Sequence, residues 1–206
     1  MRMRNPKYKD EVINNCTYLI TDEIDFKDMS KPLHIEIGMG KGDFILNKAL
    51  SHPNINFIGI EKYSNVVSVA IKKINEYELD NLKIIISDVN KLGELLNKKV
   101  DLIYLNFSDP WPKDRHAKRR LTHENFLKLY DRFFKGDAEV IQKTDNDNLF
   151  LFSVESLKNY GYEIIDITYD LHSTKIPNIE TEYERKFSDK GFKIKYVHAK
   201  KINLQD

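Results

Sequence analysis

Short apolar runs alternate with stretches of helical spacing along most of this chain, and this alternation narrows the possible folds more than any other feature. Five runs rich in Ile, Leu and Val are expected to be strands, at residues 33–38, 55–61, 82–87, 100–107 and 138–144. Apolar residues at helical spacing lie between or after them, at Phe44–Ala49, Val66–Ile74, Phe126–Phe133 and Leu149–Leu157. Strands that alternate with helices predict an α/β fold with a mostly parallel, doubly wound sheet.

The C-terminal part of the chain follows a different pattern. Residues 162–171 and 192–200 each alternate apolar and polar side chains with a period of two, and no long helical stretch separates them. Mixed sheets often carry an antiparallel strand at one edge. The sequence therefore predicts an antiparallel hairpin added to the parallel sheet.

Length and composition fit a single globular domain. The chain has 206 residues, with 33 Lys and Arg against 32 Asp and Glu, so overall basicity does not argue for nucleic acid. The basic residues 1–10 are expected to form a mobile arm, and residues 11–206 one domain. The single Cys16 excludes an internal disulfide. No apolar run approaches the roughly 18 residues of a membrane span, and the start lacks the apolar stretch of a signal peptide. We expect a cytoplasmic protein.

A glycine-rich loop follows the first expected strand. Gly38, Gly40 and Gly42 would let the backbone approach a ligand closely. A dinucleotide fingerprint needs a third glycine at position 43, where this chain has Asp43, and that carboxylate and Glu36 would repel a pyrophosphate. The pattern favours a ligand with cationic and hydroxyl groups, such as S-adenosylmethionine. A plain strand-to-helix turn is the alternative.

Two further acids end the next two expected strands. Glu61 lies 61 − 42 = 19 residues after the last glycine, where an acid often binds the hydroxyls of a ribose. Asp88 closes the third strand and could accept the exocyclic amine of an adenine. Taken singly, each acid could equally be a solvated strand end or an N-cap. Because acids recur at or near three consecutive strand ends, we favour a cofactor site.

The segment 106–120 joins an acid, an aromatic ring and a group of cations. Asp109 follows the fourth strand, and two prolines flank Trp111, the only tryptophan. Prolines restrict the backbone and would hold both side chains still. Lys and Arg follow at 113, 115, 118, 119 and 120, and such clusters neutralise phosphates. The alternatives are a rigid loop with a core tryptophan and an ordinary solvated basic face.

These motifs together resemble those of a known family, the bacterial tRNA (guanine-N7-)-methyltransferases of the TrmB type. The resemblance rests on EIGMGKGDF, GIEKY, NFSDPWPKDRHAKRRL, QKTDN and TEYERKF, over roughly residues 30 to 190. It implies a Rossmann-like class I methyltransferase fold. It also implies transfer of a methyl group from S-adenosylmethionine to N7 of the variable-loop guanosine (position 46) of tRNA, which yields S-adenosyl-L-homocysteine. A metal is not expected, and the protein is expected to be a monomer or a homodimer.

The resemblance also implies roles for individual residues. Asp109 would be the catalytic residue. The cofactor side would comprise Glu36, Gly38, Gly40, Glu61, Asp88 and Asp109, the glycines being added from the loop pattern. The guanosine side would comprise Lys113, Asp145, Thr181, Glu182, Tyr183 and Glu184. The RNA-contact segment would comprise Arg115, His116, Ala117, Lys118, Arg119 and Arg120.

The chemistry of the acceptor atom indicates what Asp109 would do. Guanine N7 has a free lone pair, so no proton must leave before attack, and we expect Asp109 to act by orientation and charge stabilisation. Three alternatives stay open: a non-catalytic RNA-binding protein on this fold, a methyltransferase for another nucleic-acid atom, and a nicotinamide oxidoreductase. The glycine register disfavours the last.

Overall fold

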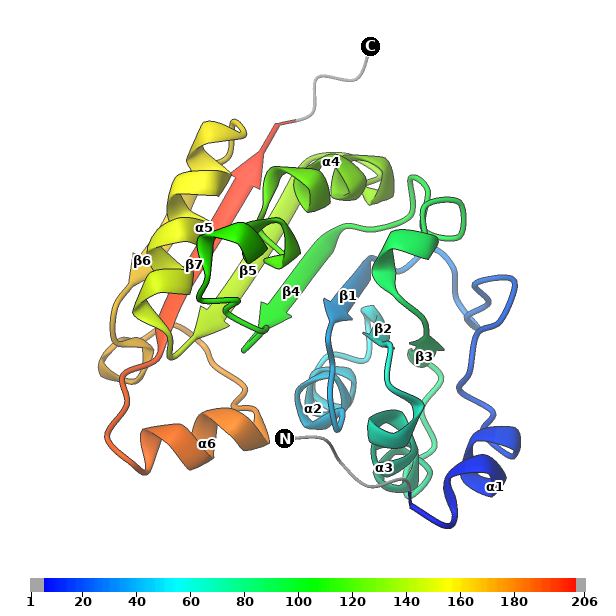
Figure 1. Cartoon of the computed structure of the whole chain (residues 1–206). Coiled ribbons are helices and arrows are strands. Elements are labelled where there is room, and N and C mark those ends of the chain that lie inside the picture. The colour runs from blue at the N-terminus through cyan, green and yellow to red at the C-terminus, as the bar shows by residue number, and fades with distance from the viewer. Residues whose placement is uncertain (1–5, 203–206) are drawn as a thin grey trace. The chain divides into compact units, whose positions relative to one another are not determined.

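A computed structural model describes residues 6–202 of the chain (Figure 1). It divides into two compact units, residues 1–95 and 96–206. Each unit combines strands with covering helices. No helix within the described residues is long and apolar enough to cross a membrane.

The first unit has a parallel sheet of three strands. Its elements are α1 (Lys9–Asn14), β1 (Leu33–Ile37), α2 (Asp43–Ser51), β2 (Asn56–Glu61), α3 (Ser64–Ile74), β3 (Leu82–Ile86) and the 3₁₀ turn η1 (Val89–Lys91). The strand order is β3-β2-β1, with Ile35 opposite Ile58 and Gly59 opposite Ile84. Near-continuous runs of buried side chains in these strands are typical of a parallel sheet.

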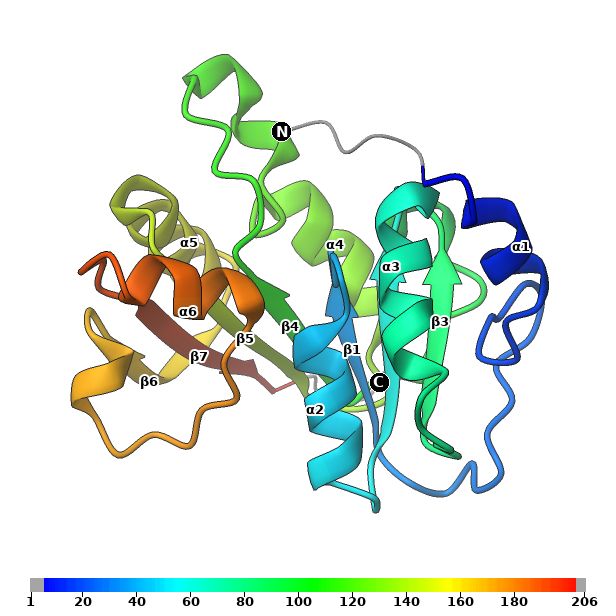
Figure 2. The ribbon, with the colours of Figure 1, turned by 90° about the horizontal axis from the view of Figure 1, so that it is seen from below.

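Helices α2 and α3 lie side by side and both contact β2 (Figure 2). The inner face of α3 shows why this segment is a helix: Val67, Ala70, Ile71 and Ile74 recur at helical spacing, and all four are fully buried. The carboxyl end of β1 and the start of α2 are therefore held firmly, with the glycine loop between them.

The second unit has a mixed sheet of four strands. Its elements are β4 (Leu102–Asn106), η2 (Asp114–Arg119), α4 (Glu124–Phe133), β5 (Ala138–Thr144), α5 (Asp147–Asn159), β6 (Glu163–Thr168), η3 (Leu171–Ser173), α6 (Glu182–Ser188) and β7 (Lys195–Lys201). The order is β4-β5-β7-β6: β4 and β5 run parallel, whereas β7 runs antiparallel to both β5 and β6. Helix α5 packs against β5, β6 and β7.

The structure confirms the predicted α/β class, mostly parallel with antiparallel C-terminal strands. Each of the first six expected strands contains an observed one, the seventh overlaps β7, and each helical stretch forms a helix. The last predicted strand begins later than expected, at Lys195 instead of residue 192, because residues 192–194 still belong to the loop after α6.

The predicted N-terminal arm overlaps an observed helix. Helix α1 begins at Lys9 and packs on α3, and the Lys72 ammonium lies 3.7 Å from the centre of the Tyr8 ring. Residues 9 and 10 are thus helical, and residues 1–5 of the predicted arm lie outside the described residues. That residues 11–206 form one domain stays a prediction.

Candidate active site

The glycine loop turns back onto β2. The amides of Gly38 and Met39 both donate to the Ile60 carbonyl, at 2.8 and 3.0 Å. Gly38 and Gly40 have φ of 81° and 56°, a backbone conformation that residues with a Cβ rarely adopt. A Cβ added at either position would meet nothing within 4 Å, so open space lies beside this backbone. The loop has the shape of a cradle for a closely approaching ligand.

Glu61 at the end of β2 is fixed to this loop. Its Oε2 accepts from the Gly40 amide at 3.3 Å, and its Oε1 accepts from the amides of Lys62 and Tyr63 at 2.8 and 3.0 Å. Backbone donors therefore hold the carboxylate in one orientation. A carboxylate has about four lone-pair sites, which leaves acceptor capacity for ligand hydroxyls.

The two acids that flank the loop lie in different surroundings. Glu36 is only 2% exposed within β1. Asp43 begins α2 and forms an ion pair with Lys73 of α3 at 2.6 Å. The charge of Asp43 is thus compensated within the unit, and Glu36 is the buried acid next to the glycines.

Asp88 is the N-cap of η1. Its Oδ1 accepts from the backbone and side-chain nitrogens of Asn90, at 3.0 and 2.7 Å. The pKa of Asp88 is lowered, mainly by the hydrogen bond from the backbone N–H of Asn90. Partial burial opposes this effect. The capping interpretation is therefore correct, and the predicted contact with adenine stays a prediction.

In the second unit, the loop that carries Asp109 has two strained residues. Phe107 and Trp111 have φ of 49° and 43°, and neither is glycine. Such residues cost about 1–3 kcal/mol each and persist only where neighbours fix them. Phe107 packs against the buried cluster of Leu171, Ile194 and Tyr196. Asp109 itself is exposed.

Trp111 is half-buried, so the core interpretation of this residue is only partly correct. The His116 ring meets it edge-on at 5.7 Å between centroids, and the Arg119 guanidinium lies 4.7 Å from its ring centre. The Trp111 ring thus contacts a cation and an imidazole of the segment that follows it.

The predicted RNA-contact segment folds as η2, and its side chains separate into two groups. Arg115, Lys118 and Arg119 are exposed, as is the preceding Lys113, whereas His116 and Ala117 are half-buried. Arg120 is only 7% exposed and donates from Nε to the Pro110 carbonyl at 3.1 Å and from Nη2 to the Trp111 carbonyl at 3.0 Å. Arg120 thus points inward, unlike its neighbours.

Three predicted site segments meet around Tyr183. Its ring centroid lies 5.0 Å from that of Phe107, two residues before Asp109. Burial, and then the nearby Asp145 carboxylate, raise the pKa of Tyr183. The Asp145 carbonyl accepts from Lys195 Nζ at 2.9 Å, and the side chain that caps α5 belongs to Asn146. Asn146, and not Asp145, therefore caps α5, and the Asp145 carboxylate interacts with the Tyr183 hydroxyl.

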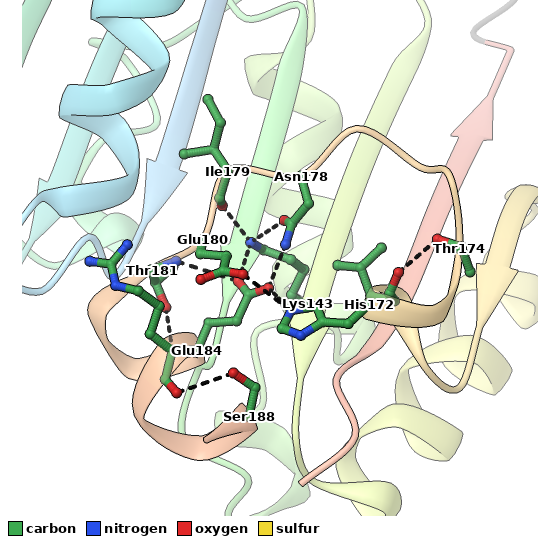
Figure 3. A network of polar contacts seen from close by, with 11 residues as sticks. Lys143, His172, Thr174, Asn178, Ile179, Glu180, Thr181, Glu184 and Ser188 are labelled. Atoms are coloured by element: carbon green, nitrogen blue, oxygen red, sulfur yellow. Dashed lines mark hydrogen bonds and ion pairs between the residues drawn. The ribbon is translucent and has the colours of Figure 1, made fainter. Parts of the chain in front are cut away.

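Glu184 lies in a buried polar network that ties α6 to β5 (Figure 3). The side chains of Lys143 and Glu184 are 3% and 0% exposed, and Nζ and Oε2 are 2.6 Å apart. Lys143 Nζ also donates to the Asn178 side chain and the Ile179 carbonyl, each at 2.9 Å. Oε1 of Glu184 contacts His172 Nε2 at 2.8 Å and the Asn178 amide at 2.6 Å.

The same carboxylate closes the capping box of α6. Thr181 Oγ1 accepts from the Glu184 amide at 2.8 Å, and Glu184 Oε2 accepts from the Thr181 amide at 3.4 Å. Burial would raise the pKa of Glu184, but attraction to Lys143 and hydrogen bonds from three side chains lower it. Glu184 is therefore ionised and surrounded by donors of this chain, whereas Glu182 and Tyr183 are exposed.

Comparison with known proteins decides the family. The methyltransferase family model Methyltransf_4, described as "Putative methyltransferase", matches residues 30–197. The solved structure of the 16S rRNA methyltransferase KamB superposes with a TM-score of 0.63 at 14% identity, covering 87% of this chain and 96% of that one. This likeness shows the fold, that of class I methyltransferases.

Two curated relatives carry the same name. The tRNA (guanine-N(7)-)-methyltransferase of Macrococcus caseolyticus is 44% identical over 97% of this chain and 100% of its own length. That of Lachnoclostridium phytofermentans is 48% identical over 93% of this chain and 94% of its own length. This chain belongs to the tRNA (guanine-N7-)-methyltransferase family.

Sequence reasoning missed several residues of this tRNA (guanine-N7-)-methyltransferase family member that organise the site. Lys143, His172 and Asn178 were not singled out, because their role depends on long-range contacts with Glu184. One local signal was available: Thr181 and Glu184 have the spacing of a capping box. No group of three or more His, Cys, Asp or Glu that could hold a metal occurs in residues 6–202.

Proposed function

We propose that this protein transfers the methyl group of S-adenosylmethionine to N7 of the variable-loop guanosine of tRNA, position 46. The sequence identity of 44% and 48% to the two tRNA (guanine-N(7)-)-methyltransferases, over nearly the whole chain, supports this proposal. The two units supply separate parts of the machinery: the glycine loop in the first, Asp109 and its surroundings in the second.

The first unit fits S-adenosylmethionine. Open space beside Gly38 and Gly40 admits the ligand against the backbone, and the fixed Glu61 carboxylate offers acceptors for ribose hydroxyls. Glu36 places negative charge near a cationic ligand, and Asp88 is assigned to the adenine. When bound, S-adenosylmethionine supplies an electrophilic methyl group on a sulfonium.

Asp109 acts by charge and orientation. Attack through the N7 lone pair makes the purine ring positive, and a fixed carboxylate stabilises charge most where it develops. The Asp109 side chain is exposed, and the backbone on either side of it is constrained at residues 107 and 111. It also serves the cofactor side of the reaction. No proton has to leave N7, so Asp109 need not be a general base.

The guanosine is assigned to residues of the second unit. Asp145 accepts from the N–H donors of the guanine edge, while Thr181, Glu182 and Tyr183 line the base and Lys113 contacts a phosphate. Glu184 contributes through its buried ion pair with Lys143, which fixes that segment. The exposed Arg115, Lys118 and Arg119, with the half-buried His116 and Ala117, form the RNA-contact surface.

The expected setting is the cytoplasm, with tRNA as partner and without a metal, as a monomer or homodimer. The test of the function is methyl transfer from labelled S-adenosylmethionine to unmodified tRNA, followed by mapping of the label. Label on N7 of one variable-loop guanosine is the expected result. Label on another atom would favour a different nucleic-acid methyltransferase, and binding of tRNA without transfer would favour a non-catalytic RNA-binding protein.

A further inference from the structure

Arg120 differs from the other cations of its segment in what it contacts. Its guanidinium spans the carbonyls of Pro110 and Trp111, at 3.1 and 3.0 Å, and lies 4.4 Å from the centre of the Phe152 ring of α5. The side chain is 7% exposed, whereas Lys118 and Arg119 are exposed. Burial and these contacts remove Arg120 from the surface that would meet a phosphate.

The two carbonyls belong to the residues that directly follow Asp109. Proline has no amide donor, so the loop cannot secure residues 110 and 112 through their own nitrogens. Trp111 lies between them at a φ of 43°, which is unfavourable for a residue with a Cβ. The contacts from Arg120 oppose relaxation of this backbone, because they bind the carbonyls of the two peptide groups that flank the Trp111 Cα.

An arginine suits this task better than a lysine. Its planar fork presents several N–H donors in fixed directions, and its flat face stacks on an aromatic ring. Lysine at the same place would keep the charge but lose the fixed two-point geometry and the stacking on Phe152.

We propose that Arg120 is a positioning residue, which holds the Asp109 loop in its reactive arrangement and does not contact RNA. This inference rests on the proposed function, because the loop matters for methyl transfer only if Asp109 does. Arg120 then differs in role from the exposed cations of the basic segment: they contact RNA, whereas Arg120 holds the Asp109 loop in place.

The experiment compares Arg120→Lys with the wild type and with Arg132→Lys, a matched change at an exposed arginine of α4. For Arg120→Lys, kcat should fall by at least about tenfold, since small misplacements of reacting groups are costly. The dissociation constants for tRNA and S-adenosylmethionine should stay within about twofold, and the salt dependence of tRNA binding should not change. Arg132→Lys should behave as the wild type.

Trp111 gives a second readout that does not depend on activity. It is the only tryptophan of the chain, so its fluorescence reports the loop directly. In Arg120→Lys, acrylamide should quench this fluorescence more strongly and its anisotropy should fall. If the wild type methylated no RNA, the proposed function would fail. The fluorescence would still test whether Arg120 holds the Asp109 loop in place.

Two results would overturn the inference. One is unchanged kcat and unchanged Trp111 fluorescence in Arg120→Lys. The other is a loss confined to tRNA affinity with a weaker salt dependence, which would make Arg120 an RNA contact. If Arg120→Lys does not fold, Phe152→Leu, which removes the ring that contacts both Arg120 and His123, is judged by the same criteria.

Discussion

Two adjacent arginines show how strongly surroundings decide the role of a residue. Arg119 is exposed and lies over the Trp111 ring, whereas Arg120 is buried and donates to backbone carbonyls. Glu182 and Glu184 differ in the same way, one exposed and one with 0% of its side chain accessible. The sequence marks both segments as important, but burial and hydrogen-bond partners separate the residues within them.

Asp109→Asn tests the charge of the proposed catalytic carboxylate. The amide keeps the size of the side chain but removes the negative charge that stabilises the positive purine, so kcat should fall by about a hundredfold. Affinity for S-adenosylmethionine should change by less than about threefold, since most of that site is assigned to the glycine loop and Glu61 by our proposal. Steady-state kinetics and cofactor titration measure both quantities.

The matched control for this change is Asp114→Asn, at an exposed acid that begins η2. It removes the same charge from a nearby position without a proposed role in the reaction, and kcat should be retained. Equal kcat for Asp109→Asn and the wild type would exclude the proposed role of Asp109.

Glu184→Gln tests the buried network. The change removes the buried carboxylate that pairs with the Lys143 ammonium, which should lower the free energy of unfolding by about 3–5 kcal/mol at pH 7. Urea denaturation measures this value. Glu155→Gln, at an exposed residue of α5, is the control and should change it by less than about 0.5 kcal/mol.

The lowered pKa of Glu184 also predicts how the stability of the wild type and of Glu184→Gln should differ with pH. A carboxyl with a lower pKa in the folded than in the unfolded state stabilises the protein above its unfolded pKa, and this stabilisation is lost as pH falls through the folded pKa. Below about pH 4.5, the ordinary value for a glutamate, wild-type stability should therefore decline more steeply than that of Glu184→Gln. Parallel curves would contradict the ionised state of Glu184.

At the scale of elements, apolar patterning was sufficient to predict the strands β1 to β7 and the helices α2 to α5, but not α1, which overlaps the expected mobile arm. Apolar runs mark the strands β1 to β5, which are largely buried, and the period of two marks β6 and β7, although the side chains of β6 are mostly exposed. The boundaries after α6 and the inward turn of Arg120 depend on distant contacts. These include Phe152, so local patterns do not reveal them.

The basic segment is an element whose role can be tested as a group. Replacing Arg115, Lys118 and Arg119 by alanine should weaken tRNA binding if, as we propose, these exposed cations neutralise phosphates. The slope of the logarithm of the binding constant against that of salt should decrease by about one for each lost phosphate contact. Binding titrations at several salt concentrations measure the slope.

A triple alanine variant at Lys128, Arg132 and Lys158 is the control for net charge. These exposed cations of α4 and α5 have no proposed role, and the variant loses the same three charges. Its salt slope should remain close to that of the wild type. Equal effects of the two variants would mean that overall charge, and not the basic segment, determines binding.

The turn from β1 into α2 tests the glycine loop as an element. Gly42 has a φ of 75°, and a Cβ there would lie 3.0 Å from that of Ala70 on α3. Gly42→Ala should lower the free energy of unfolding by at least about 1–2 kcal/mol and weaken S-adenosylmethionine binding. Gly136→Ala is the control, since its Cβ would meet nothing within 4 Å. Equal stabilities of both variants would contradict the claim that position 42 requires a glycine.

At the scale of the whole molecule, charge is almost balanced. With 33 basic and 32 acidic residues, affinity for a polyanion must come from local surfaces and not from the net charge of +1. The sequence motifs predicted the family correctly because they extend along most of the chain. The roles of single residues remain predictions, since they depend on the bound RNA and cofactor.

The acceptor atom is the most direct test of the proposed function. Two tRNAs that differ only at the variable-loop guanosine would be compared: one natural, and one with 7-deazaguanosine, in which carbon replaces N7. Labelled S-adenosylmethionine should methylate the natural tRNA, and the substituted tRNA should accept no label while binding with the same affinity. Equal methylation of both would contradict N7 as the acceptor.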